Sequence, residues 1–148
     1  PSPSNKRRFL QHTEGYGKVI ELVELGAWSH RAVLRFNADF PNSPGSHRVD
    51  PVGTERIDVI DIDSFVRDKN TPVHLIKMDI EGAEFEALQG ARQTIATHHP
   101  KLQISIYHKL THLWELQELI ESTGKDYAYY VGHHSAIHTE TILYAKPR

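Results

Sequence analysis

The sequence contains no cysteine, and its single methionine, Met78, lies in the middle of the chain. The absence of cysteine excludes disulfide bonds and thiolate metal sites. No apolar run is long enough to cross a bilayer, and no signal peptide is recognisable. The formal net charge is only -2, so electrostatics favour neither nucleic acid nor an anionic membrane as a partner. We therefore expect a soluble, cytoplasmic protein.

What the chain does contain is typical of a globular domain. Its 148 residues are enough for one hydrophobic core, and 39% of them are hydrophobic while 24% are charged. There is no internal repeat and no recognisable linker, so we predict a single domain over residues 1–148. Because position 1 is proline, either an initiator methionine was removed or the chain is part of a longer one.

The hydrophobic pattern predicts alternating helices and strands, an α/β protein. Helices are expected over residues 6–13, from Asp63 or Ser64 to residue 69, over 83–97 and over 113–122. Strands are expected over residues 19–25, 32–36, 56–61, 73–80, 102–107, 127–131 and 141–145. Residues 37–53, which are polar and rich in Pro, Gly and Ser, are expected to form a loop. The short separation of the last two strands predicts an antiparallel hairpin.

The segment from residue 73 to 91 reads as a strand, a turn at Gly82 and a helix, which is half of a parallel βαβ unit. Asp79 and Glu81 fall where the strand ends and, because strand side chains alternate, point to one side. Ligands of open α/β sheets bind at the carboxyl ends of the strands. Asp79 and Glu81 are thus candidate binding residues. The alternative is that they only complement the dipole of the following helix, as we expect of Glu84 and Glu86.

Residues 76–84 read Ile-Lys-Met-Asp-Ile-Glu-Gly-Ala-Glu, and Leu-Gln-Gly-Ala follows at 88–91. Together with Pro100, the strand ending at His108, and residues 140–145, this pattern resembles the FkbM family of methyltransferases. The resemblance spans residues 57–146 and is carried by the combined pattern, since the Asp-x-Glu-Gly piece alone is weak. It implies a three-layer, Rossmann-like class I methyltransferase sheet, mostly parallel with a C-terminal antiparallel hairpin. It also implies S-adenosylmethionine as the cofactor and, in most members, a hydroxyl group as the methyl acceptor.

A glycine-rich turn after the first strand holds the cofactor in such folds. The only Gly-x-Gly here is Gly15-Tyr16-Gly17, which precedes a strand and is interpreted as a simple turn. By the resemblance, an acidic residue that ends the second strand holds the cofactor ribose. We expect the first two strands, the glycine turn and this acid to be missing, which makes the chain an N-terminally truncated, C-terminal portion of the family domain.

The resemblance also assigns cofactor contacts. Gly26, Ala27 and Trp28 would lie near the adenine, with Trp28 able to stack on it. The alternative is that Trp28 is an ordinary core or surface aromatic residue. Asp79 is a further candidate cofactor contact, because one of the positions open to it is beside the sulfonium.

Methyl transfer from a sulfonium is an in-line displacement, and the acceptor hydroxyl often needs a base. His108 ends a strand beside that of Asp79, and a neutral imidazole is the natural base at pH 7. Asp79 would orient the acceptor or take its proton, and Glu81 would bind substrate hydroxyls. The alternative for His108 is a histidine bonded to the backbone at a strand end.

The chain has eleven histidines, but no zinc-protease motif is present. Asp79, Glu81 and His108 could hold a divalent ion, although we expect no functional metal. The predicted function is O-methylation of a small-molecule acceptor, a sugar or a natural product. The alternative is a non-catalytic remnant or interaction module that lacks a complete cofactor site.

Overall fold

The structure is a computed structural model that describes residues 3–16, 19–37, 48–49 and 51–148. The chain divides into two compact units, of which unit 1 comprises Pro1–Gly26 and Ala32–Val59 and unit 2 comprises Ala27–Arg31 and Ile60–Arg148. Two strands, β1 (Gly26–Trp28) and β4 (Glu55–Asp61), begin in unit 1 and end in unit 2. Among the described residues no helix has the length and apolar character needed to span a membrane. The single-domain interpretation stays a prediction.

In unit 1, helix α1 (Pro3–His12) accompanies the strands β2 (Ala32–Asn37) and β3 (Arg48–Val49). The sheet has the order β1-β4-β2-β3, and β2 runs antiparallel to both β3 and β4. Most of the predicted polar loop, residues 38–47 and 50, lies outside the described residues.

The strand predicted over residues 19–25 is wrong, because these residues form no strand. The N–H groups of Val19 and Ile20 both donate to the carbonyl of Tyr16, in a turn rather than a sheet ladder. Val19 and Leu25 are 80% and 40% exposed, so the alternating pattern has no apolar face to pack against. An ion pair between Lys6 and Glu24 (Nζ to Oε1, 2.6 Å) joins this segment to α1.

Unit 2 contains a sheet of the order β5-β6-β8-β7, made of β5 (Leu75–Met78), β6 (Lys101–Ser105), β7 (Tyr127–His133) and β8 (Thr141–Pro147). The antiparallel pairing of β7 with β8 confirms the predicted C-terminal hairpin. Of the pairings whose register is described, however, only β5 with β6 is parallel. This sheet is therefore not mostly parallel as predicted, because the hairpin places β8 antiparallel to β6. In the other sheet, β2 and β4 are also antiparallel. The Rossmann-like layering and the missing first strands stay predictions.

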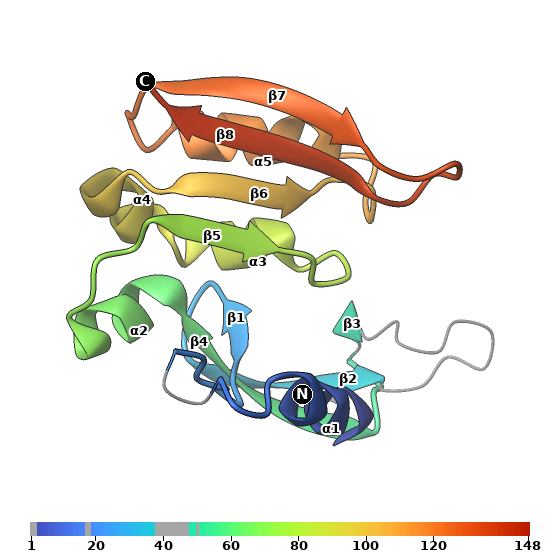
Figure 1. Cartoon of the computed structure of the whole chain (residues 1–148). Coiled ribbons are helices and arrows are strands. Elements are labelled where there is room, and N and C mark those ends of the chain that lie inside the picture. Colours follow the sequence, from blue (N-terminus) through green and yellow to red (C-terminus); the bar gives the residue numbers. More distant parts are fainter. Residues whose placement is uncertain (1–2, 17–18, 38–47, 50) are drawn as a thin grey trace. The chain divides into compact units, whose positions relative to one another are not determined.

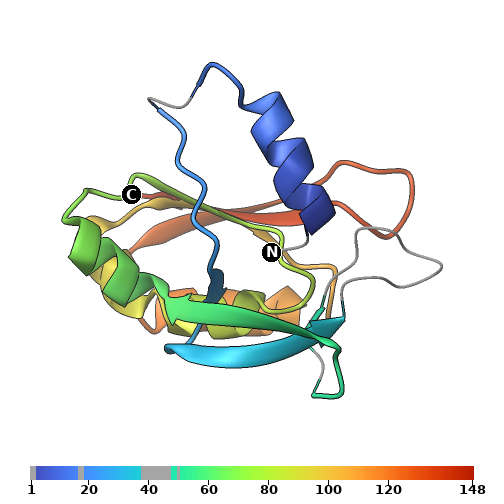
Figure 2. The ribbon, with the colours of Figure 1, turned by 90° about the horizontal axis from the view of Figure 1, so that it is seen from below.

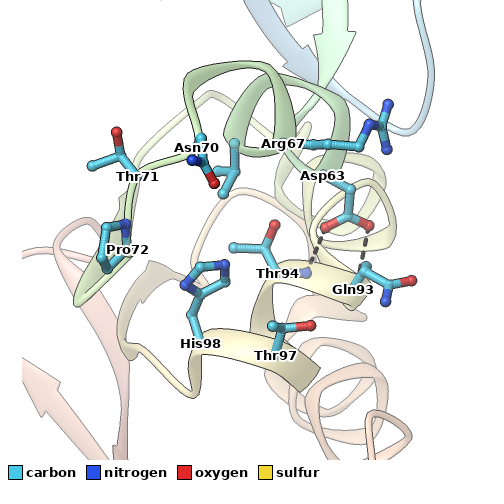
Figure 3. A pocket seen from close by; sticks show the side chains of 10 residues that line it. Asp63, Arg67, Asn70, Thr71, Pro72, Gln93, Thr94, Thr97 and His98 are labelled. Atoms are coloured by element: carbon cyan, nitrogen blue, oxygen red, sulfur yellow. Dashed lines mark hydrogen bonds between the residues drawn. The ribbon is translucent and has the colours of Figure 1, made fainter.

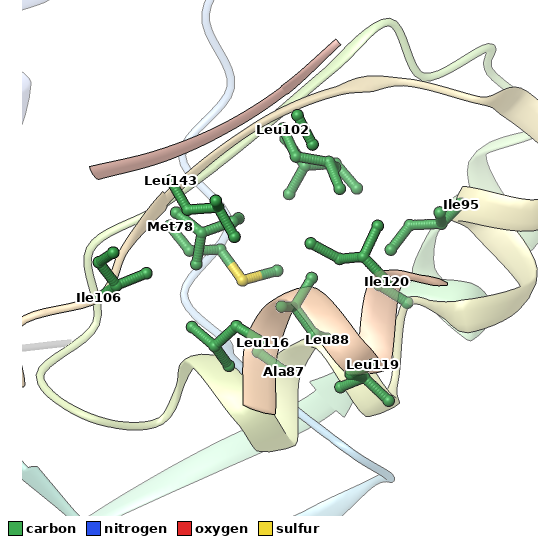
Figure 4. Packing of buried hydrophobic residues seen from close by; sticks show 14 of the residues in the cluster. Met78, Ala87, Leu88, Ile95, Leu102, Ile106, Leu116, Leu119, Ile120 and Leu143 are labelled. Carbon is green, nitrogen blue, oxygen red and sulfur yellow. The ribbon is translucent and has the colours of Figure 1, made fainter. Parts of the chain in front are cut away.

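Three helices of unit 2 lie on one face of this sheet: α3 (Glu84–Gln89), α4 (Arg92–His98) and α5 (His112–Glu121) (Figures 1 and 2). Between sheet and helices lies the hydrophobic core (Figure 4), which includes Met78, Leu88, Ile95, Leu102, Ile104, Leu116, Ile120 and Leu143. In β5, Ile76 and Met78 are buried in it, whereas Leu75 and Lys77 are exposed. The alternation of β5 thus orients the strand with one apolar face toward the helices.

The helix predicted over residues 83–97 is broken into α3 and α4 at Gly90 and Ala91. The cause is a tertiary contact with α2 (Ile62–Lys69). The carbonyl of Gly90 accepts from the N–H of Asp63 (2.8 Å), and the Asp63 carboxylate accepts from Gln93 and Thr94 (3.0 and 2.7 Å). Asp63 therefore caps α4, while Asp61 caps α2 through the N–H of Ser64 (2.7 Å). The helix predicted to begin at Asp63 or Ser64 thus begins earlier, at Ile62, with Asp61 as its N-cap.

Candidate active site

The parallel pairing of β5 with β6 brings the residues that follow the two strands to the same sheet edge. Asp79 follows β5 directly, and His108 comes three residues after β6. Between Asp79 and α3 the backbone turns sharply, with φ of 56° at Glu81 and 93° at Gly82. The turn folds the start of α3 back, so that Oε1 of Glu84 accepts a hydrogen bond from the N–H of Ile80 (2.9 Å).

The His108 imidazole lies in the middle of three carboxylates. Its Nδ1 is 2.9 Å from Oε1 of Glu84, while its Nε2 is 3.5 Å from Oδ1 of Asp79 and 3.7 Å from Oε2 of Glu81. The side chain is only 8% exposed. The three residues predicted to be catalytic are thus brought together, and Nδ1 of His108 faces a carboxylate. We call His108, Asp79, Glu81 and Glu84 the His108 cluster.

Glu84 is the fully buried member of this cluster, with 0% of its side chain exposed. Its second oxygen, Oε2, lies 3.4 Å from Nδ1 of His112, whose side chain is also buried. Both imidazole nitrogens lie close enough to the Glu84 carboxylate for ion pairing. Because a buried carboxylate is costly unless it is paired, the charge of Glu84 has to be balanced by a neighbouring imidazole.

The pKa directions identify that imidazole as His108. Burial lowers the pKa of His108, but Glu84, followed by Glu81 and Asp79, outweighs it, so the pKa is raised. Burial raises the pKa of the Glu84 carboxyl, but the contacts with His108 and Ile80 outweigh it, so that pKa is lowered. Burial dominates at His112, whose pKa is lowered. The fold therefore favours the imidazolium form of His108 more than an unperturbed histidine would, because the surrounding carboxylates raise its pKa. The role of neutral base stays a prediction.

Asp79 has a further partner in Tyr107, whose hydroxyl donates to Oδ1 of Asp79 at 3.2 Å. Burial and then the charge of Asp79 raise the pKa of Tyr107 above its ordinary value, so the phenol keeps its proton as a donor. The Tyr107 ring also packs on the His108 ring, with centroids 4.1 Å apart. Tyr107 thus helps to fix the two side chains that flank it.

Asp79, Glu84 and His108 also have the approximate spacing of metal ligands. One potential ligand atom from each lies within 4.8 Å of the others. Two nitrogen or oxygen ligands of one zinc ion are at most about 4.4 Å apart, since each bond is about 2.0–2.2 Å. The group would have to close slightly to hold such an ion. The expectation of no functional metal stays a prediction.

The residues predicted to contact the adenine form β1. A Cβ on Gly26 would lie 2.8 and 2.9 Å from side-chain atoms of Ile57 and Val59, so this glycine permits close packing within unit 1. Ala27 packs against the core of unit 2, and the half-buried Trp28 places its carbonyl against Gly90. These are structural contacts, and the proposed adenine contacts stay predictions.

A hollow of about 740 Å³ lies at the other end of the parallel strands, between α2 and α4 (Figure 3). Two of its polar side chains already have protein partners: Asp63 caps α4, and Nδ1 of His98 accepts from the N–H of Val73 (3.3 Å). The His108 cluster contributes nothing to its lining. We therefore place the candidate active site at the carboxyl ends of β5 and β6 rather than in this hollow.

Sequence reasoning missed Glu84 and Tyr107 as members of the site. A helical projection could have found Glu84, because residues three, four and seven positions later are Ala87, Leu88 and Ala91, all fully buried. A glutamate on the apolar face of a helix indicates a buried ion pair. No comparable signal marks Tyr107, which lies two residues beyond the end of β6.

The comparisons with known proteins agree with this architecture. The family description "Methyltransferase FkbM domain" matches residues 1–136. The chain belongs to the FkbM methyltransferase family. The crystal structure of methyltransferase FkbM from Methylobacillus flagellatus KT is similar over 98% of this chain, with 31% sequence identity and a TM-score of 0.77. No curated protein matches the chain significantly.

The FkbM family resemblance stated from the sequence is thus confirmed. The chain spans 34% of the length of the Methylobacillus protein, so it corresponds to about a third of that relative. The segment around Asp79, Glu81 and Glu84 and the strand leading to His108 both lie within the matched residues. The site described above therefore belongs to the FkbM domain itself.

Proposed function

We propose that this FkbM domain takes part in the transfer of a methyl group from S-adenosylmethionine to a hydroxyl oxygen of a small-molecule acceptor, a sugar or a natural product. The observation that carries the proposal is the convergence of Asp79, Glu81 and His108 at the carboxyl ends of β5 and β6. Family membership supports the reaction class. The acceptor class rests on the family resemblance alone.

The residues of the His108 cluster fit a positively charged cofactor. Its carboxylates outnumber its one imidazolium, which leaves excess negative charge at the sheet edge. Asp79 and Glu81 are 31% and 36% exposed, so a ligand can reach them. When bound, S-adenosylmethionine would supply a methyl group already activated on a cationic sulfur. A cation beside these carboxylates would be stabilised electrostatically.

Each residue then has a role that its contacts allow. Asp79, held by the Tyr107 hydroxyl, orients the acceptor hydroxyl. Asp79 would take the proton that the acceptor hydroxyl loses when it receives the activated methyl group that S-adenosylmethionine would supply. Glu81 accepts from a second acceptor hydroxyl. His108, as an imidazolium, presents its Nε2 proton to Asp79 and Glu81 and holds them in place.

The test is a methyl-transfer assay with labelled S-adenosylmethionine and a panel of hydroxyl acceptors. Asp79→Ala is expected to lower turnover by about 100-fold or more, because it removes the proton acceptor. Asp68→Ala is the matched control, since Asp68 is an exposed aspartate of α2 outside the cluster. Turnover that is the same in Asp79→Ala and Asp68→Ala would remove Asp79 from the mechanism.

A further inference from the structure

Glu84 is the one carboxylate of the His108 cluster to which the proposed reaction gives no role. It is fully buried, so it cannot touch an acceptor. Its backbone begins α3, and the helix is anchored in the core by Ala87 and Leu88, both 0% exposed. The hydrogen bond from the N–H of Ile80 to Oε1 fixes the carboxylate itself. Glu84 is therefore a rigid negative charge set behind the site.

The position of the Glu84 carboxylate determines the orientation of the His108 ring. The two nitrogens of an imidazole point in different directions, and the partner of one nitrogen fixes the direction and the proton of the other. With Nδ1 at 2.9 Å from Glu84, the ring has its Nε2 on the side of Asp79 and Glu81. A ring turned by 180° about its Cβ–Cγ bond would lose this arrangement and leave Glu84 without its closest partner.

We propose that Glu84 is a positioning residue for methyl transfer: its buried carboxylate holds a proton on Nδ1 of His108 and thereby aims Nε2 at Asp79 and Glu81. The proposal deepens the proposed function and rests on it for its catalytic consequence. The geometry of the pair does not depend on that function. A purely structural Glu84 would stabilise the turn at Ile80 without governing the protonation of His108.

The variant that separates these roles is Glu84→Gln, which has nearly the same shape, retains an oxygen for the Ile80 N–H and removes the charge. Glu86→Gln is the matched control, because Glu86 lies on the same helix and forms an ion pair with Lys109 (3.8 Å). Histidine side-chain ¹⁵N spectra of the full chain, recorded over a pH series, report the titration of each ring. The His108 signals are assigned by their loss in His108→Gln.

We expect the His108 titration midpoint to fall by at least about one pH unit in Glu84→Gln, a tenfold change in the protonation equilibrium, and to stay unchanged in Glu86→Gln. A folded Glu84→Gln protein with an unchanged His108 midpoint overturns the proposal. A second measurement uses the spectrum of the unsubstituted chain, with the same assignment. Above its midpoint, neutral His108 should carry its proton on Nδ1, and a proton on Nε2 instead would equally overturn the proposal.

Neither spectrum requires cofactor or acceptor, so a failure of the proposed function is distinguishable from a failure of this inference. In the methyl-transfer assay, Glu84→Gln is expected to lower kcat and shift its pH profile while changing KM for S-adenosylmethionine little, since Glu84 is out of reach of ligands. An unchanged kcat profile alongside a shifted His108 midpoint would overturn the catalytic part.

Discussion

At the scale of single residues, the His108–Glu84 pair is the most consequential feature of the molecule. Folding raises the pKa of His108 and lowers that of Glu84. The His108 contribution to stability is present below the ordinary imidazole value of 6.5 and is lost as pH rises through the raised pKa. The Glu84 contribution is present above 4.5 and is lost as pH falls through the lowered pKa. The pair therefore stabilises the fold most between pH 4.5 and pH 6.5, where both contributions are present.

A pH series with His108→Gln tests this linkage. Because the substitution leaves Glu84 buried without its counter-charge, we expect it to lower the free energy of unfolding by about 3–5 kcal/mol near pH 6. The difference from the unsubstituted chain should shrink as pH rises through the raised pKa of His108. Urea unfolding at each pH measures the difference, with the exposed His138→Gln as control. A difference that grows with pH would contradict the assigned sign.

Sequence reasoning reached the residues on the open side of the candidate site. Asp79, Glu81 and His108 were accessible because strand-end positions can be counted along the chain, and the structure brings these three together. Glu84 was assigned only to the helix dipole, because the turn at Glu81 and Gly82 that buries it depends on two positive φ angles. The protonation of His108 could not be predicted without that buried charge.

At the scale of elements, the local hydrophobic pattern predicts the wrong structure where tertiary contacts, or the lack of a partner strand, override it. The apolar periodicity of residues 83–97 predicts one helix, but Asp63 of α2 supplies the capping contacts that start α4 separately. The isolated segment 19–25 alternates well but has no partner strand. Conversely, α5 and β8 agree closely with prediction, because their apolar faces pack directly on the core of unit 2.

A substitution at Gly90 tests the close approach of Trp28 to the α3–α4 junction. A Cβ at this position would lie 2.1 Å from the carbonyl oxygen of Trp28 and 2.9 Å from Cβ of Asp61. Its φ of -77° suits any residue, so Gly90→Ala isolates the steric cost. We expect a loss of about 1–3 kcal/mol or more in the free energy of unfolding by urea.

The exposed neighbour Gln89→Ala serves as the control and should change stability by less than about 0.5 kcal/mol. A Gly90→Ala protein as stable as this control would show that Trp28 does not lie against the helix junction. That outcome would also remove the structural role assigned to the β1 segment.

At the scale of the whole molecule, the chain belongs to the FkbM family but spans 34% of the length of its structural relative. Family and general α/β class were accessible from the motif and from the order of elements. The dominance of antiparallel pairings was not, because strand direction depends on how the hairpin docks on β6. The glycine turn and the ribose acid, which were expected to be missing, are not needed to assemble the His108 cluster, because its members all lie between residues 79 and 108.

The central claim is that the negative rim of the His108 cluster receives the cationic methyl donor. Calorimetric titration of the full chain with S-adenosylmethionine tests it most directly. We predict binding with a Kd tighter than about 1 mM. Asp79→Asn should weaken binding by about tenfold, which corresponds to about 1.4 kcal/mol, whereas Asp68→Asn should leave it unchanged. The absence of binding, or binding that Asp79→Asn does not weaken, would contradict the account.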